Sequence, residues 1–355
     1  MKKIKIIQII ELFILVIIAM GLIGFLTSVS KNSELKKDKT SVRFDFDFGS
    51  AEHKELKKCK EEQVSSSGIE KIEIDLGSCD LQVIATDEDV IKIVESSSKN
   101  LDESELFTLS NENGRLKVTK GNLFKGFIFH FGMIGHKLQV FIPKKYIGNL
   151  SLSTGSGDIT LDSDLELKDL IVNAGSGDLE INSSVKAQSF KSKLGSGHIN
   201  AGHVECKDYA LNTGSGDIEI ESLKGSGRIE VSSGSIRVDE LIGGEYDIES
   251  SSGDIIVNNI EGMGEIHASS GDIEAAYKGI NEYAKLDASS GEINVKLDKT
   301  ISFEMDARCA SGEVRGNVPM DYKDKDGKEA KAKVGDEPSA KLTFTTASGD
   351  ITVNQ

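Results

Sequence analysis

A short phrase, Ser-Gly followed in most copies by an acidic residue and an Ile or Val, recurs from about residue 150 onward at a nearly constant spacing. Successive marker glycines are 18 to 21 residues apart, except the last two, which are 37 apart. A period of this length in a sequence rich in β-formers is typical of a solenoid, in which each repeat forms one coil and stacks on its neighbours. We therefore expect an all-β solenoid of about ten coils over residues 150–355, with corners at Gly157, Gly177, Gly197, Gly216, Gly234, Gly253, Gly271, Gly291, Gly312 and Gly349.

Apolar and polar residues alternate on both sides of each marker glycine, which indicates strands with one buried face. In one repeat the apolar positions are Leu170 and Val172 before the glycine and Leu179 and Ile181 after it. The inward side changes parity at the glycine, so the chain turns a corner there, and glycine tolerates the positive φ that a tight corner often needs. A further apolar point such as Val185 follows in most repeats. Each coil is thus expected to have two short strands and a third, looser wall.

The N-terminal segment, residues 1–30, has three lysines among its first five residues and then an apolar run over 6–26. About twenty such residues can span a bilayer as a helix, and the concentrated charge before them favours a cytoplasmic N-terminus. We expect a single-pass anchor in the cell membrane, with the body of the protein extracytoplasmic; a cleaved signal peptide is the alternative. Residues 31–67 are charged and rich in Ser, and are expected to form a flexible tether with a candidate strand at 43–48.

Two regions depart from the regular repeat. Residues 68–149 are expected to form a degenerate first coil, with Cys79 at the glycine position, followed by antiparallel strands that cap the stack and include a hairpin at residues 113–114. Residues 321–340 are expected to be a charged surface loop that accounts for the long last spacing. No cap is evident after the last phrase, so the final strand is expected to have a free edge through which copies could associate.

The ordered phrases KIEIDLGSCDLQVIATDED, KLQVFIPKKYIGNLSLSTGSGDITL and the serial SGDI repeats carry a family resemblance over roughly residues 68–355. Together they resemble the bacterial β-strand-repeat family catalogued as "putative adhesins", which includes the LiaG-type membrane-anchored proteins of the cell envelope. The resemblance implies a non-enzymatic protein of the envelope, since no enzyme chemistry is attached to the family. The chain departs from the usual phrase at Cys79, His198, Ser235, Glu292 and Glu313.

Acidic residues follow most marker glycines and would lie close to one line along the stack, namely Asp158, Asp178, Asp217, Asp254, Asp272 and Asp350. One interpretation is a carboxylate ladder that holds Ca²⁺ or another hard cation. The other is that each side chain bonds local backbone N–H groups at its corner. The second is favoured, because His198 and Ser235 occupy the same position and the denser nonapeptide of metal-binding β-rolls is absent.

A second feature is the aromatic run at 122–137, which could contact a membrane surface or a partner, or could pack over the end of the core. Its phenylalanines are Phe124, Phe127, Phe129 and Phe131. The four cysteines, Cys59, Cys79, Cys206 and Cys309, show no CxxC spacing, so neither a disulfide framework nor a zinc site is expected. Cys309 falls at an inward position, Cys59 in the tether and Cys206 in a coil linker.

The net charge of −16 opposes nucleic acid and favours cationic partners. The chain has no Trp and no evident Ser/His/Asp or His/Glu set, so no catalytic residue and no cofactor are predicted. We expect a membrane-anchored solenoid that binds or senses an envelope component, or adheres through its faces. The alternative is a scaffold that self-associates through its last coil; a polysaccharide-processing β-helix enzyme is the third and least favoured reading.

Overall fold

The computed structural model describes residues 56–120 and 135–355. Every described residue belongs to one compact unit, His53–Gln355. The expected anchor at 1–30 and the candidate strand at 43–48 therefore lie outside the described residues. Among the residues that are described, no helix is long and apolar enough to cross a membrane.

The described unit consists of strands and one short 3-10 helix, η1 (Glu103–Glu105). The strands are β1 (Lys57–Ser65), β2 (Lys71–Leu76), β3 (Asp80–Thr86), β4 (Val90–Ser97), β5 (Phe107–Glu112), β6 (Arg115–Lys120), β7 (His136–Pro143), β8 (Asn149–Thr154), β9 (Ile159–Leu161), β10 (Leu165–Ala174), β11 (Leu179–Leu194), β12 (Ile199–Ser215), β13 (Ile218–Ser233), β14 (Ile236–Ser250), β15 (Ile255–Ser270), β16 (Ile273–Ser290), β17 (Ile293–Leu297), β18 (Phe303–Ser311), β19 (Val314–Gly316), β20 (Met320–Tyr322), β21 (Glu329–Val334), β22 (Ala340–Ser348) and β23 (Ile351–Asn354).

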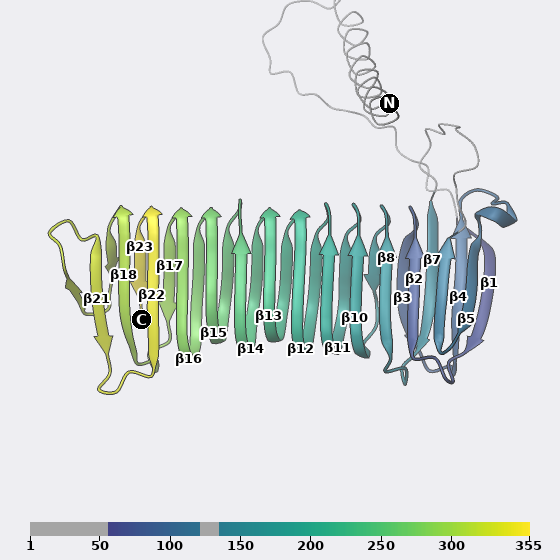
Figure 1. Cartoon of the computed structure of the whole chain (residues 1–355), viewed down its shortest axis with the longest axis horizontal. Helices are drawn as coiled ribbons and strands as arrows, with labels where there is room; N and C mark the ends of the chain where they lie inside the picture. The colour runs from purple at the N-terminus through teal and green to yellow at the C-terminus, as the bar shows by residue number, and fades with distance from the viewer. Residues whose placement is uncertain (1–55, 121–134) are drawn as a thin grey trace, which may run out of the picture. The chain divides into compact units, whose positions relative to one another are not determined.

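The expected all-β solenoid is confirmed. From β10 to β16 each strand pairs in parallel with the strand one coil further on, so the same repeat position lies side by side in successive coils, as at Ile199, Ile218 and Ile236 (Figure 1). A long strand such as β11 forms part of all three walls of its coil. It begins just after one corner glycine, crosses the third wall and ends just before the next corner glycine. Each coil is therefore bonded to two neighbours along most of its length.

The core is a continuous aliphatic column inside the stack. Leu170, Val172, Leu179, Ile181 and Val185, which the alternation places inward within one repeat, are all at most 2% exposed. Burying one such side chain contributes roughly 1.5–3 kcal/mol. Much of that contribution depends on the coils above and below, because a coil standing alone would leave its inward side chains open to water.

At the N-terminal end the stack has one layer more than expected. The coil made by β2 and β3 rests directly on β8 and β9. Strands β6 and β7 then pair in parallel with β2 and β3 and form a further layer. They also pair antiparallel with β5 and β4, so they belong to the expected antiparallel region and continue the stack as well. The antiparallel cap consists of β1, β4 and β5. Strand β1 also corrects the expected tether, because eight of its nine residues pair with β4, with a bulge at Cys59.

The hairpin expected at residues 113–114 joins β5 to β6. Asn113 and Gly114 have φ angles of 52° and 75°. Positive φ at both central residues is what a two-residue hairpin turn of type I′ requires.

At the C-terminal end the order of coils differs from the order of the sequence. Strand β22 lies between β16 and β18, and β23 lies between β17 and β19. Figure 1 shows these yellow strands inside the stack and not at its end. The expected free edge of the final strand is therefore wrong, because insertion gives β22 and β23 a bonded neighbour on both sides.

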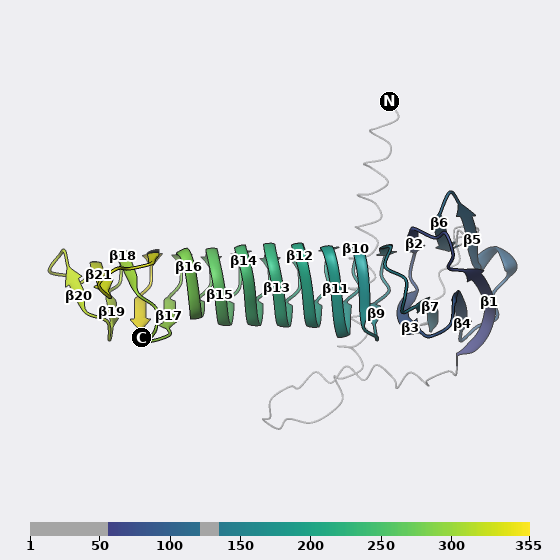
Figure 2. The ribbon, with the colours of Figure 1, turned by 90° about the horizontal axis from the view of Figure 1, so that it is seen from below.

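The segment 321–340, expected as a charged loop, holds strand β21. Strand β21 runs antiparallel to β18, and β20 pairs with β21 beyond it. This hairpin covers the outer edge of β18 and caps the C-terminal end, opposite the cap of β1, β4 and β5 (Figure 2). A cap that the sequence did not reveal is thus present at this end.

Candidate functional site

The marker glycines form one ridge along the stack, as predicted, and the reason they must be glycine is the close approach of successive coils. A Cβ atom added to Gly177 would lie 2.0 Å from the carbonyl oxygen of Gly157, far inside any real Cβ contact. The corner of Gly253 also has a positive φ of 137°, whereas Gly177 does not have a positive φ. Close approach to the neighbouring coil is thus common to all the marker glycines, whereas only some of them have a positive φ. In stacking order the ridge runs Cys79, Gly157, Gly177, Gly197, Gly216, Gly234, Gly253, Gly271, Gly291, Gly349 and Gly312.

The aspartates beside the ridge bond from coil to coil. The backbone N–H of Asp178 donates to Oδ1 of Asp158 at 3.0 Å, and the N–H of His198 donates to Oδ1 of Asp178 at 2.7 Å. His198 continues the ladder, because its Nδ1 accepts the N–H of Asp217 at 3.0 Å. Asp217 in turn accepts the N–H of Ser235 at 2.8 Å. The structural interpretation therefore has geometric support, with one change: the N–H lies 18 to 20 residues further on and not in the same corner.

The second half of the ladder repeats this pattern. Asp254 accepts the N–H of Asp272, and Asp272 accepts the N–H of Glu292, both at 2.8 Å. Asp350 accepts the N–H of Glu313 at 3.0 Å, which follows the stacking order and not the sequence order. No group of three or more His, Cys, Asp or Glu side chains within 56–120 and 135–355 is arranged to hold a metal ion. The geometry thus lends no support to a cation ladder.

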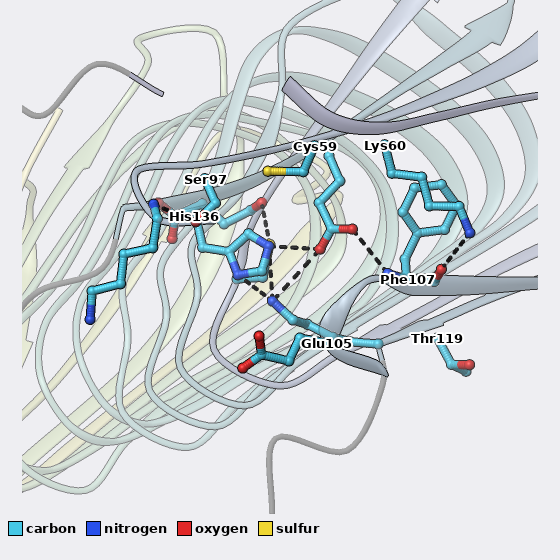
Figure 3. Close-up of polar contacts among 12 residues, drawn as sticks. Cys59, Lys60, Ser97, Glu105, Phe107, Thr119 and His136 are labelled. Atoms are coloured by element: carbon cyan, nitrogen blue, oxygen red, sulfur yellow. Dashed lines mark hydrogen bonds and ion pairs between the residues drawn. The ribbon is translucent and has the colours of Figure 1, made fainter. Parts of the chain in front are cut away.

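A buried polar cluster lies among β4, β6 and β7 at the N-terminal end, where the chain leaves the described part after Lys120 and returns at Gly135 (Figure 3). Glu95, His136 and the side chain of Lys120 are 1%, 8% and 4% exposed. Nε2 of His136 is 2.7 Å from Oε1 of Glu95, and the Lys120 ammonium contacts the His136 ring. The other carboxylate oxygen of Glu95 accepts the backbone N–H of Phe107 at 2.9 Å. Each charged group of the cluster thus has a partner.

Burial governs the ionisation around this cluster. It lowers the pKa of Lys120, while the negative charge of Glu95 acts in the opposite direction. Burial also raises the pKa of the Cys79 thiol to about 12. The closed hydrogen bonding and low exposure of the cluster indicate that it holds β4, β6 and β7 together, because an unpaired charge here would be strongly destabilising.

The four cysteines are free thiols. Cys309 is buried, as its inward position predicts, and Cys206 is buried as well, although it was expected in a coil linker. Cys59 lies in β1, not in a tether. The aromatic residues Phe124, Phe127, Phe129 and Phe131 lie outside the described residues, so their expected contact with a membrane or partner stays a prediction.

A groove on the third wall, which sequence reasoning missed, crosses β10 to β14 and has a volume of about 740 Å³. Its floor consists of Leu167, Ala187, Cys206, Gly225 and Gly243. A second hollow of about 830 Å³ continues from it toward the N-terminal cap, and the two share the exposed Ile147 and Lys168 among their lining residues.

Charged side chains line both sides of the floor. On one side, Lys186 and Lys224 both pair with Glu205, at 3.7 and 3.2 Å. On the other side stand Lys168 and Lys207, which make no ion pair with any described residue. The recurrence of these lysines near the coil period is the signal that could have revealed the groove, and the acidic balance of the whole chain concealed it.

Fold and site together define a capped, single-stack β-solenoid whose accessible surfaces are its lateral walls. The chain belongs to the Toastrack DUF4097 family, whose model matches residues 69–244 and 233–354. The expected resemblance to a β-repeat family is thereby confirmed. None of the curated proteins matches the chain significantly.

Several solved structures are similar to the chain at low identity. A putative adhesin from Parabacteroides distasonis is 11% identical with a TM-score of 0.42, covering 84% of this chain and 98% of its own. A putative lipid binding protein from the same organism is 16% identical with a TM-score of 0.40, covering 82% and 96%. A putative adhesin from Bacteroides fragilis is 12% identical with a TM-score of 0.37, covering 84% and 97%.

Proposed function

We propose that this protein is a non-enzymatic, membrane-anchored binding protein whose solenoid lies outside the cytoplasm and contacts or senses a component of the cell envelope, in the manner of an adhesin. The observation that carries the proposal is the combination of closed ends and open lateral walls. Residues 1–30 supply the expected anchor and orientation, through their apolar run and their N-terminal lysines.

The closed ends favour binding over self-assembly. Strands β22 and β23 are bonded on both sides, and antiparallel strands cover both ends of the stack. The outer strand β1 carries Lys57, Lys58 and Lys60, a charge pattern that opposes edge-to-edge pairing. A scaffold that grows end to end would need a strand edge suited to pairing at each end. The outer edges belong to the lysine-bearing β1 and the three-residue β20, so a scaffold is the less favoured function.

The buried cluster also argues for a non-enzymatic role. Glu95, His136 and Lys120 have the residue types of an acid–base site, but they are buried and satisfy one another. A catalytic group must reach its substrate within hydrogen-bond distance. These three side chains are turned to one another and not to an open surface.

The test is fractionation and protease accessibility of the full chain in intact cells, with a tag at the C-terminus. We expect the protein in the membrane fraction after a high-salt wash, and loss of the tag when protease is added outside the cytoplasmic membrane. A tag that stays protected until the membrane is broken would refute the extracytoplasmic location. Release of a shortened protein into the soluble fraction would instead support a cleaved signal peptide.

A further inference from the structure

We propose that the third-wall groove binds a linear anionic polymer that carries phosphate or carboxylate groups along its length. The inference rests on the proposed function, since it names the class of envelope component that the solenoid contacts. Three features of the groove support such a ligand: its lysines, its floor and the spacing of its charges.

The groove has a local excess of positive charge. Counted over the described part of the chain, the lining of the groove holds four lysines, Lys168, Lys186, Lys207 and Lys224, against two acidic residues, Glu166 and Glu205. Lys186 and Lys224 share the single carboxylate of Glu205, and Lys168 and Lys207 have no ion-pair partner within the described residues. All four lysines are exposed, so their ammonium groups are available to a ligand. An anionic ligand would complete pairs that the protein itself leaves incomplete.

The floor of the groove is lined mainly by small residues, at a place where neighbouring coils approach each other closely. Along the floor Leu167 is followed by three smaller residues, Ala187, Cys206 and Gly225. A Cβ atom on Gly225 would lie 2.2 Å from the carbonyl oxygen of Cys206, so a larger residue cannot fill this part of the floor. A chain-like ligand can therefore lie along the stack between two rows of longer side chains.

The length of the groove and the spacing of its lysines suit an extended ligand. Neighbouring strands are about 4.8 Å apart, so Lys168 on β10 and Lys207 on β12 stand about 10 Å from each other along the stack. The groove crosses five strands, β10 to β14, or about 19 Å, before the second hollow is added. A single small anion would engage one lysine, whereas an extended polymer can engage several at once, which strengthens binding without any new type of contact.

The same features disfavour a nucleic acid as the occupant. Single-stranded nucleic acids are bound by aromatic side chains that stack on bases. Among the residues that the structure describes, Tyr146 is the one aromatic residue that lines the two hollows, and it is 7% exposed. The chain's net charge of −16 does not prevent local binding of a polyanion, because charges further than about 8 Å away are largely screened at physiological salt.

The test uses the full chain in nanodiscs of electrically neutral lipid, titrated with inorganic polyphosphate, with polygalacturonate and with neutral dextran. The variant Lys168→Gln/Lys207→Gln removes the two unpaired groove lysines. The matched control Lys278→Gln/Lys299→Gln removes two exposed lysines that also lack ion pairs within the described residues and do not line the groove. Both double variants change the net charge equally, and a thermal melt of each checks that the fold is kept.

We expect saturable, salt-sensitive binding of at least one of the two polyanions and none of dextran. Exposed ion pairs contribute roughly 0.2–1 kcal/mol each, so loss of two pairs should make the groove variant bind between about twofold and thirtyfold more weakly, with the control within about twofold of the native chain. Tighter binding of polyphosphate than of polygalacturonate would identify a phosphate polymer, and the reverse order a carboxylate polymer.

Equal losses in the two variants would overturn the proposal, because net charge alone would then explain binding. So would binding of dextran, absence of saturation, or tighter binding of a single-stranded oligonucleotide than of either polymer. Failure of the titration and failure of the protease-accessibility test can be told apart. Purified protein can bind a polyanion whatever its location in the cell, and protease accessibility in intact cells does not depend on the groove lysines.

Discussion

Replacing one ridge glycine with alanine should destabilise the solenoid far more than replacing a glycine elsewhere in a coil. A Cβ atom on Gly253 would lie 2.1 Å from the carbonyl oxygen of Gly234, which belongs to the backbone of the adjacent coil and cannot rotate away. Gly253 also has a φ of 137°, which side chains rarely adopt. At Gly279, by contrast, the nearest atom is 4.0 Å from the added Cβ, so Gly279→Ala is a matched control.

The expected magnitude follows from three contributions. Overpacking against a fixed backbone costs about 1–3 kcal/mol, and an alanine held in a sparsely populated positive-φ conformation costs about 1–3 kcal/mol more. Alanine also restricts the unfolded chain, which returns about 0.4–1 kcal/mol. The free energy of unfolding should therefore fall by about 3 kcal/mol for Gly253→Ala. It should stay level or rise slightly for Gly279→Ala.

Urea unfolding of residues 53–355, followed by circular dichroism, measures the difference. With a slope of about 3 kcal/mol per molar urea for a chain of this size, the midpoint for Gly253→Ala should fall by about 1 M. A comparison of slopes is needed, because stacked coils can unfold in blocks. If Gly253→Ala and Gly279→Ala shifted the midpoint equally, close coil approach would not be the reason for glycine on the ridge.

Three further predictions test other parts of the structure. Asp178→Ala should lower the free energy of unfolding by about 0.5–1.5 kcal/mol because it removes the acceptor of the exposed His198 N–H, whereas Asp178→Asn should cost less; equal losses in urea unfolding would contradict the ladder. Burial raises the pKa of Cys206 to about 12, so at pH 8 Cys206 stays a protonated thiol. It should therefore react with iodoacetamide well after the half-buried Cys59, which peptide mass spectrometry can measure. Faster labelling of Cys206 than of Cys59 would refute its burial. Deletion of residues 340–355 should open the edges of β16 to β19 and cause self-association measurable by light scattering, and a monodisperse monomer would contradict their place inside the stack.

The sequence was sufficient for everything that repeats within one coil. Period-two alternation and the position of the glycine give the inward face, the corner and the all-β class, because both depend on residues close in the chain. Residues such as Leu170 and Ile181 are buried where the pattern places them. The ridge follows in the same way, since equal spacing puts equivalent positions on one line when coils stack in order.

The tertiary structure decided which coils are neighbours. All coils offer much the same edge of backbone N–H and C=O groups, so local sequence does not distinguish a partner one repeat away from one two repeats away. Strand β22 could therefore enter between β16 and β18, with the 37-residue spacing allowing the chain to leave and return. The lysine groove and the Glu95–His136–Lys120 cluster likewise depend on which strands lie side by side. Such contacts join residues far apart in the chain, and they arise only when the three-dimensional stack has formed.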